Sequence, residues 1–229
     1  MNNAFDSIPF YGPGSLIIDL RTRGYGESLY RNLDGFVQFE GKDLTLTDVD
    51  IDKFVRKFKR SQNFNLVDLG AVIVTGPIGL AATKGGAYAN LALFSKGDTT
   101  HVAHILSRID VENGRAVLSD VAMATPETRI AGTGYVDLAA DTIDLSVDVV
   151  NRMGCSLVGQ QVYGTIEEVE RSKVKIVKTL LGPVENFLKG VSIVDCKPIY
   201  EGSVDPPPNK SELRKIERAA KKAAKELSD

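Results

Sequence analysis

The sequence has little of what most catalytic sites use. Tryptophan is absent, and the 229 residues include only two histidines and two cysteines. Neither a Gly-x-Ser-x-Gly nucleophile elbow nor a glycine-rich phosphate loop followed by lysine occurs. His101 and His104 stand three residues apart with no third ligand nearby, which is too few for a metal site. We therefore expect no enzymatic activity, no bound metal and no cofactor.

Long apolar runs and an excess of one charge are missing as well. No segment approaches the ~20 apolar residues of a membrane-spanning helix. The first residues lack the basic start and apolar core of a signal peptide. The net charge of -2 gives no reason to expect nucleic acid as a partner. Taken literally, these features predict a soluble cytosolic protein; the alternative is that Met1 begins a fragment whose targeting segment is missing.

The clearest structural signal runs from Ile109 to Val150 and predicts consecutive antiparallel strands. Asn113-Gly114 fits a type I′ hairpin turn, because both residue types accept positive φ. The last strand, Thr142 to Val150, alternates between apolar and polar residues, which predicts one buried and one wet face. Its apolar positions are Ile143, Leu145, Val147 and Val149, and its polar positions are Asp144, Ser146 and Asp148.

Further elements follow from the same periodicities. Apolar segments predict strands at Ser15–Arg23, Phe36–Glu40, Asp43–Thr47, Leu66–Val74, Ala87–Phe94, Gln160–Gly164 and Ser192–Tyr200. Helices are expected at Glu27–Leu33, Ile51–Phe58, Thr99–Ser107 and Val174–Leu188, the last interrupted by Pro183. The fold class is therefore α+β, with a curved, mostly antiparallel β-sheet, helices on one side and a C-terminal helix.

The domain organisation is expected to have three parts. Residues 1–13 form a flexible lead-in, residues 14–205 form the folded domain, and residues 206–229 form a proline spacer and an amphipathic helix. Asn209 and Glu212 match a capping box at the start of that helix. Its thin apolar stripe among basic residues leaves two interpretations: a helix on an anionic membrane surface, or a helix that docks on its own domain or frays.

Cys155 and Cys196 leave two alternatives when judged from the residues alone. Free cysteines are common as buried residues in cytosolic proteins. A disulfide would instead close a loop of about 41 residues and contribute roughly 4 kcal/mol by chain entropy.

A series of short motifs follows a recognisable order from Gly14 to Pro207. Its centre is the run Gly132-Thr133-Gly134-Tyr135-Val136-Asp137-Leu138, followed by Asp141-Thr142-Ile143-Asp144. The other motifs are Leu33-Asp34-Gly35, Leu44-Thr45-Leu46, Asp50-Ile51-Asp52, Val111-Glu112-Asn113-Gly114, Val121-Ala122-Met123-Ala124, Gly154-Cys155, Gln160-Gln161, Gly164, Gly182-Pro183, Cys196 and Tyr200-Glu201-Gly202-Ser203-Val204. Their order resembles the C-terminal region of AsmA-like proteins.

The resemblance implies a large envelope protein of Gram-negative bacteria, located in the periplasm and anchored in the inner membrane by an N-terminal helix. It implies a β-sheet groove that carries phospholipid toward the outer membrane, and hence a role in outer-membrane biogenesis. In one branch of the family the two cysteines, here Cys155 and Cys196, are expected to pair. Because the anchor and most of the groove are missing, we interpret this chain as the C-terminal domain of a longer protein, or as a short relative.

Two functions follow as hypotheses. The first is a non-enzymatic domain that contributes to phospholipid transport, in which an apolar lining stabilises acyl chains by about 0.8 kcal/mol per buried CH₂. The candidate lipid-facing residues, expected to share one face, are Val117, Val121, Leu145, Val147 and Val149. For each of them the alternative is sealed core beneath a helix such as Val174–Leu188. The second function is a structural or docking module that caps or recruits an envelope protein partner in the periplasm without binding lipid.

Overall fold

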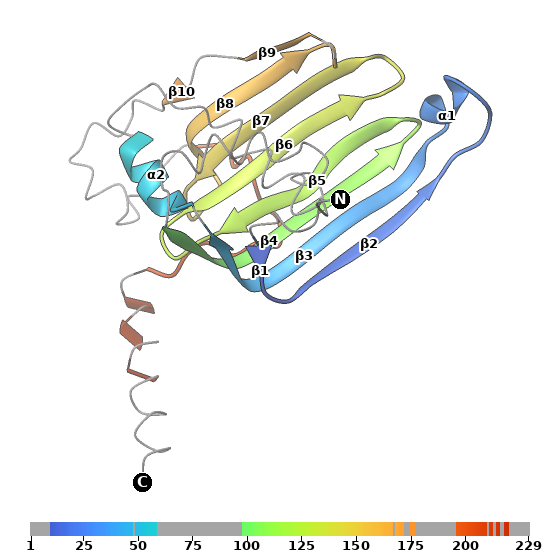
Figure 1. The fold of residues 1–229 in the computed structure, drawn as a ribbon. Helices are drawn as coiled ribbons and strands as arrows, with labels where there is room; N and C mark the ends of the chain where they lie inside the picture. The colour runs from blue at the N-terminus through green and yellow to red at the C-terminus, as the bar shows by residue number, and fades with distance from the viewer. Residues whose placement is uncertain are drawn as a thin grey trace.

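The computed structural model describes residues 10–47, 49–58, 98–166, 168–171, 175–176 and 196–209, with helical residues 211–212, 214–215 and 218–219. These residues form a curved, open, antiparallel sheet with few helices (Figure 1), which confirms the predicted fold class. The strands are β1 (Phe10–Tyr11), β2 (Gly14–Arg21), β3 (Asp34–Thr47), β4 (Thr99–Glu112), β5 (Arg115–Ala124), β6 (Arg129–Asp137), β7 (Thr142–Val150), β8 (Ser156–Gly164), β9 (Val169–Arg171) and β10 (Lys175–Ile176). The helices are α1 (Ser28–Arg31) and α2 (Ile51–Phe58).

Neighbouring strands are mostly neighbours in the sequence. The order across the sheet is β1-β3-β4-β5-β6-β7-β8-β10, with β2 also pairing with β3 and β9 with β8. The predicted meander is therefore confirmed as β4 to β7. Its first turn has φ values of 50° at Asn113 and 78° at Gly114, as a type I′ turn requires.

This turn also holds the start of β3 and the residue before it. The backbone N–H of Gly114 donates to the carbonyl of Leu33 over 2.9 Å. The N–H of Asn113 donates to the carboxylate of Asp34 over 2.8 Å. The hairpin tip is thus a docking point between the β4–β5 hairpin and the chain that follows α1.

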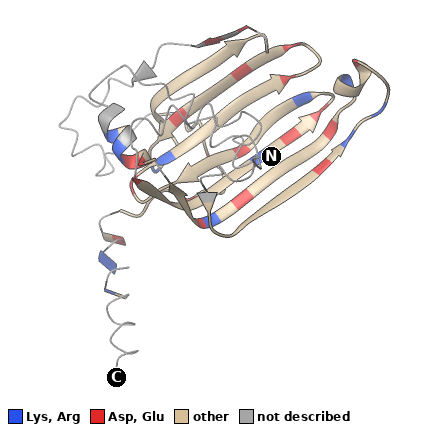
Figure 2. Ribbon diagram, viewed as in Figure 1, with Lys and Arg blue, Asp and Glu red and all other residues tan. Residues whose placement is uncertain are grey.

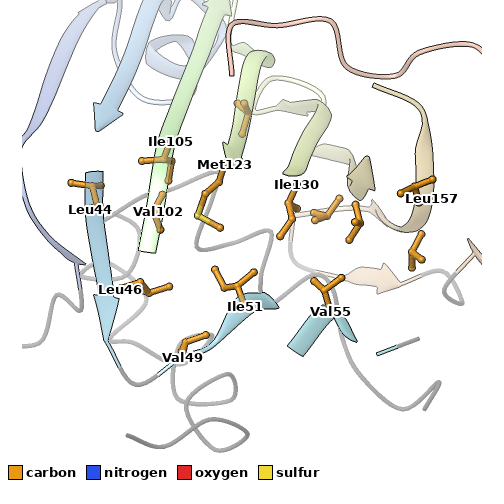
Figure 3. Packing of buried hydrophobic residues seen from close by; sticks show 14 of the residues in the cluster. Leu44, Leu46, Val49, Ile51, Val55, Val102, Ile105, Met123, Ile130 and Leu157 are labelled. Carbon is orange, nitrogen blue, oxygen red and sulfur yellow. The ribbon is translucent and has the colours of Figure 1, made fainter. Parts of the chain in front are cut away.

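Helix α2 packs on one face of the sheet and seals part of the core (Figure 3). Ile51 and Val55 are buried there, as the predicted amphipathic helix requires. The hydroxyl of Thr100 accepts from the N–H of Ile51 over 2.8 Å and donates to the carbonyl of Val49. The cluster beneath α2 includes Leu44, Leu46, Val102, Ile105, Met123, Ile130 and Leu157.

The helix expected at Thr99–Ser107 is wrong, because this segment is the first half of β4. The strand pairs with β3 along almost its whole length, from Thr99 opposite Thr47 to Val111 opposite Gly35. β-branched residues such as Thr100 and Val102 favour a strand. Pairing with a distant strand cannot be read from the local spacing of His101 and His104.

Other expected elements need smaller corrections. The two strand pieces before α2 are one strand, β3, with φ of 53° at Asp43. Phe10–Tyr11 of the expected flexible lead-in pair with Leu46 and Thr45 as β1. Lys175–Ile176, expected to be helical, form β10, and residues 196–200 are not a strand. The strands expected at 66–74 and 87–94, and the helix beyond residue 176, lie outside the described residues.

The capping box predicted for the tail is confirmed. The side-chain oxygen of Asn209 accepts from the N–H groups of Ser211 and Glu212, and the Glu212 carboxylate accepts from the N–H of Asn209 over 2.7 Å. Arg152 ties the tail to the domain by donating to the carbonyl of Pro207 and to the Glu212 carboxylate. The described helical residues project away from the sheet (Figure 1).

We expect Gly114→Ala to lower the free energy of unfolding by about 1–3 kcal/mol. An added Cβ would lie 2.2 Å from the Tyr30 carbonyl oxygen, and alanine disfavours the φ of 78°. Asn113→Gly is the control, because glycine accepts the same turn and should cost less. Urea unfolding of both variants checks this, and equal loss in the two would contradict it.

Candidate functional site

The sheet has one face made almost wholly of apolar residues, which we call the apolar face. Residues directly opposite one another in antiparallel strands share a face, so the register defines rows that cross the sheet. From β2 toward β8 the rows are Gly14-Gly41-Ile105-Met123-Ile130-Val149-Val158, then Leu16-Phe39-Ser107-Val121-Gly132-Val147-Gln160, then Ile18-Val37-Ile109-Leu118, and Leu20-Gly35-Val111-Ala116-Val136-Ile143-Gly164.

No charged residue interrupts these rows. Their polar side chains, Ser107 and Gln160, are both buried. An uncharged surface that crosses β2 to β8 is the kind that hydrocarbon can cover, since no ionised group would lose its hydration. The apolar face therefore has the chemical character that the lipid hypothesis requires.

Burial changes across this face. Under α2 the apolar side chains are sealed, as Met123 and Ile130 show by being fully buried. At β2 they are open to solvent, with exposed fractions of 46% for Leu16, 58% for Ile18 and 40% for Leu20. The apolar face therefore passes from closed core to open surface at the β2 edge of the sheet.

Four of the five candidate lipid-facing residues lie on the apolar face. Val121, Val147 and Val149 are buried in the core cluster, and Leu145 packs against that cluster. The three buried valines therefore lie in sealed core, which is the alternative given for these positions. The residues of β2 that are open to solvent on this face, Leu16, Ile18 and Leu20, belong to a segment that the sequence predicts only as a strand.

Val117 lies on the opposite face, which corrects the expectation that all five residues face one way. Val117 pairs with Tyr135, and Val121 pairs with Gly132. Tyr135 and Gly132 are an odd number of positions apart in β6 and so face opposite sides of the sheet, and the two valines opposite them do the same. The cause is an irregularity in β5: Leu118 and Asp120 pair with the consecutive residues Ile109 and Arg108, which leaves Ser119 extra. Val117 is 41% exposed.

The opposite face is rich in charged and aromatic side chains, and we call it the polar face. Figure 2 shows charged positions along several strands. Arg108 donates to Asp110 and Gln38 and lies 3.6 Å from the centre of the Phe36 ring. A shallow recess here is lined by Gln38, Glu40, Leu106, Arg108, Asp120 and Ser203. Most of these charges are paired with neighbours.

One polar-face residue departs from the expected wet surface. Asp148 is buried rather than wet, because its carboxylate accepts hydrogen bonds from the hydroxyls of Ser146 and Ser156. Ser146 lies on β7, as Asp148 does, and Ser156 lies on the neighbouring strand β8. Hydrogen bonds of this kind compensate the burial of a carboxylate. The alternation of apolar and polar residues along the strand therefore predicts the wrong environment for Asp148.

Part of the polar face is covered by residues 196–205, which we call the strap. A disulfide between Cys155 and Cys196 holds its start. Next to it, the carbonyl of Gly154 accepts from the N–H groups of Ile199 and Tyr200. The pairing that the AsmA-like resemblance implied is thus present.

Tyr200 anchors the middle of the strap. Its hydroxyl donates to Asp120 over 2.6 Å and accepts from the N–H of Val204. Burial, together with the bond to Asp120, raises the pKa of Tyr200, so the hydroxyl stays protonated and can donate. Nothing in the spacing of the sequence indicated that Asp120 is its partner.

Arg129 anchors the end of the strap. Its buried guanidinium donates to the carbonyls of Val204 and Asn151, and burial lowers its pKa. Three backbone oxygens accept from this one side chain, the third being that of Arg152. The strap is therefore a structural cover, held in place by its contacts with Gly154, Asp120 and Arg129.

The described residues were searched for groups that could hold a metal and for helices that could cross a membrane. No three His, Cys, Asp or Glu side chains among them lie close enough to hold a metal. His101 and His104 contact Asp43 and Glu40 instead, at 3.5 and 3.1 Å. No helix in the described part of the chain is long and apolar enough to cross a bilayer. Comparisons of the chain with protein-family models, curated proteins and solved structures found no match.

Removing the disulfide should destabilise the protein only under oxidising conditions. We expect Cys155→Ser to lower the free energy of unfolding by up to about 4 kcal/mol in non-reducing buffer, since the bridge closes a long loop. Under reductant, wild type and variant should unfold at the same denaturant concentration. Equal stability of the two proteins without reductant would contradict the contribution of the bridge.

Removing the Tyr200 hydroxyl should also destabilise the strap. We expect Tyr200→Phe to cost about 1–3 kcal/mol, because the buried N–H of Val204 loses its acceptor. Tyr25→Phe is the control, since Tyr25 is almost fully exposed. Urea unfolding compares them; a Tyr200→Phe variant as stable as the control would show that the strap does not depend on this hydroxyl.

Proposed function

We propose that this chain is a non-enzymatic domain of the bacterial cell envelope that contributes to phospholipid transport between membranes. The observation that carries the proposal is the charge-free apolar face, open to solvent at Leu16, Ile18 and Leu20. In this proposal acyl chains lie on that open part of the face, next to the sealed core. The resemblance to AsmA-like proteins supplies the compartment and the phospholipid as ligand.

The energetics support contact with hydrocarbon. Covering apolar surface stabilises by about 25 cal/mol per Å². Large exposed apolar side chains in contiguous positions are uncommon on monomeric proteins and mark interaction surfaces. On β2 three such side chains alternate along one face, so a single acyl chain lying along the strand would contact all of them.

The disulfide supports the proposed location. Bridges between cysteines persist in oxidising compartments such as the periplasm and are rare in the cytosol. The pair Cys155–Cys196 is therefore better suited to a periplasmic domain, which in the full-length protein would be anchored in the inner membrane.

A docking module that caps or recruits an envelope partner without binding lipid is the second candidate. It is favoured by one observation: within the described residues β2 pairs only with β3, so its outer backbone edge is open. An open edge is suited to binding another strand.

We expect the protein, produced in the periplasm, to carry phospholipid at a defined stoichiometry in native mass spectrometry and after solvent extraction. Ile18→Lys should reduce the bound lipid severalfold, because it places a charge in the open apolar face. Val117→Lys is the matched control, since Val117 is an exposed β-branched residue on the polar face.

Two outcomes would contradict the lipid proposal. One is wild-type protein that carries no phospholipid and takes none from vesicles of phosphatidylethanolamine and phosphatidylglycerol. The other is equal lipid loss in both lysine variants. Lipid-free protein that crosslinks to an envelope protein through β2 would favour the docking module.

A further inference from the structure

The outer edge of β2 has none of the usual features that prevent strands from pairing. Its residues from Gly14 to Arg21 contain no proline, and they pair with β3 in an unbroken register without a bulge. Nearly all of them are exposed. Proteins normally protect such an edge with proline, bulges or inward charges, because its free N–H and C=O groups are a template for another strand.

The charges on β2 do not repel another strand either. Asp19 and Arg21 lie on the polar face and form an ion pair with each other, with contacts of 3.0 and 3.1 Å. The strand thus carries no net charge. Its other exposed side chains are mostly apolar, including Ile17, which is 48% exposed on the polar face.

We propose that β2 pairs with β2 of a second copy of this chain, antiparallel, with Ile17 at the two-fold axis. In this register Leu16 lies opposite Ile18 of the other copy on the apolar face. On the polar face, Ser15 lies opposite Asp19, so that its hydroxyl can donate to that carboxylate. Every opposed pair from Gly14 to Leu20 is therefore compatible, and the contact is self-complementary, as a two-fold interface must be.

Neighbouring registers fit less well. With Ile18 at the axis, Asp19 faces Ile17 of the other copy, which sets a charge against an apolar side chain. With Asp19 at the axis, two carboxylates oppose each other, and like charges directly opposite are destabilising. With Leu16 at the axis, only Gly14 to Ile18 can pair within the strand, and Asp19 faces Pro13. Charge, polarity and the number of paired residues together favour the register centred on Ile17, independently of whether the protein binds lipid.

The axis of this pairing is perpendicular to the sheet, since opposed residues share a face. The two apolar faces therefore lie on the same side of one larger sheet, joined across β2. An interface of one strand per copy is smaller than the ~1,600 Å² of a standard stable complex. We therefore expect a dimer that dissociates on dilution.

Sedimentation equilibrium of the full chain over a wide range of concentration tests the dimer. Wild type should show a monomer–dimer equilibrium, and Ile17→Lys should weaken it at least tenfold by opposing two lysines at the axis. Val117→Lys, with the same charge on the same face but away from the edge, should leave it unchanged. Circular dichroism confirms that both variants fold.

Crosslinking tests the register. Under mild oxidation Ile17→Cys should form a covalent dimer faster than Ile18→Cys, and much faster than Ile166→Cys, an exposed isoleucine beyond β8. Wild type that stays monomeric at all concentrations overturns the proposal. A dimer that survives Ile17→Lys, or that crosslinks equally at residues 17 and 166, overturns it too and assigns the contact to another surface.

Discussion

The long ladder between β3 and β4 is the interaction on which the rest of the structure depends. It joins two segments that are far apart in the sequence, from Gly35 opposite Val111 to Thr47 opposite Thr99. One end of β4 leads into the Asn113-Gly114 turn, which binds the segment after α1. The other end carries Thr100, which holds the start of α2. Loss of this ladder would separate the meander from β2 and from α2 together.

A single sheet has two faces, and this one covers them by different means. On the apolar face α2 seals the cluster around Ile51, while the side chains of β2 stay open. On the polar face the strap covers a small patch that includes Leu106 and Ala122, and a disulfide and hydrogen bonds secure it. The apolar face is thus covered by apolar packing, whereas the strap combines a small apolar cluster with a disulfide and hydrogen bonds.

Local signals in the sequence predicted the elements that local physics determines. The Asn113-Gly114 turn, the amphipathic helix α2 and the capping box at Asn209 each depend on residues a few positions apart, and each is confirmed. The alternation of β7 correctly indicated which side is apolar. A sheet of consecutive strands was predictable for the same reason.

The errors occur where distant residues decide the outcome. The spacing at Thr99–Ser107 predicts a helix, but this segment forms the first half of β4, whose partner β3 lies far away in the sequence. The extra residue Ser119 reverses the side to which Val117 points, and only the register with two neighbouring strands reveals this. Asp148 can be buried because the hydroxyls of Ser146 on β7 and Ser156 on β8 donate hydrogen bonds to its carboxylate. Periodicity alone contains none of this information.

The open edge of β2 links the two proposals without making either depend on the other. Residues of even number on this strand present the apolar face to solvent, while its outer backbone edge pairs with no other strand in the described part of the chain. Hydrocarbon would cover the side chains and leave the backbone edge open. A second strand would pair with the backbone and leave the apolar side chains partly exposed. The two contacts use different chemical groups of the same residues, so a joined sheet would widen the apolar surface instead of closing it.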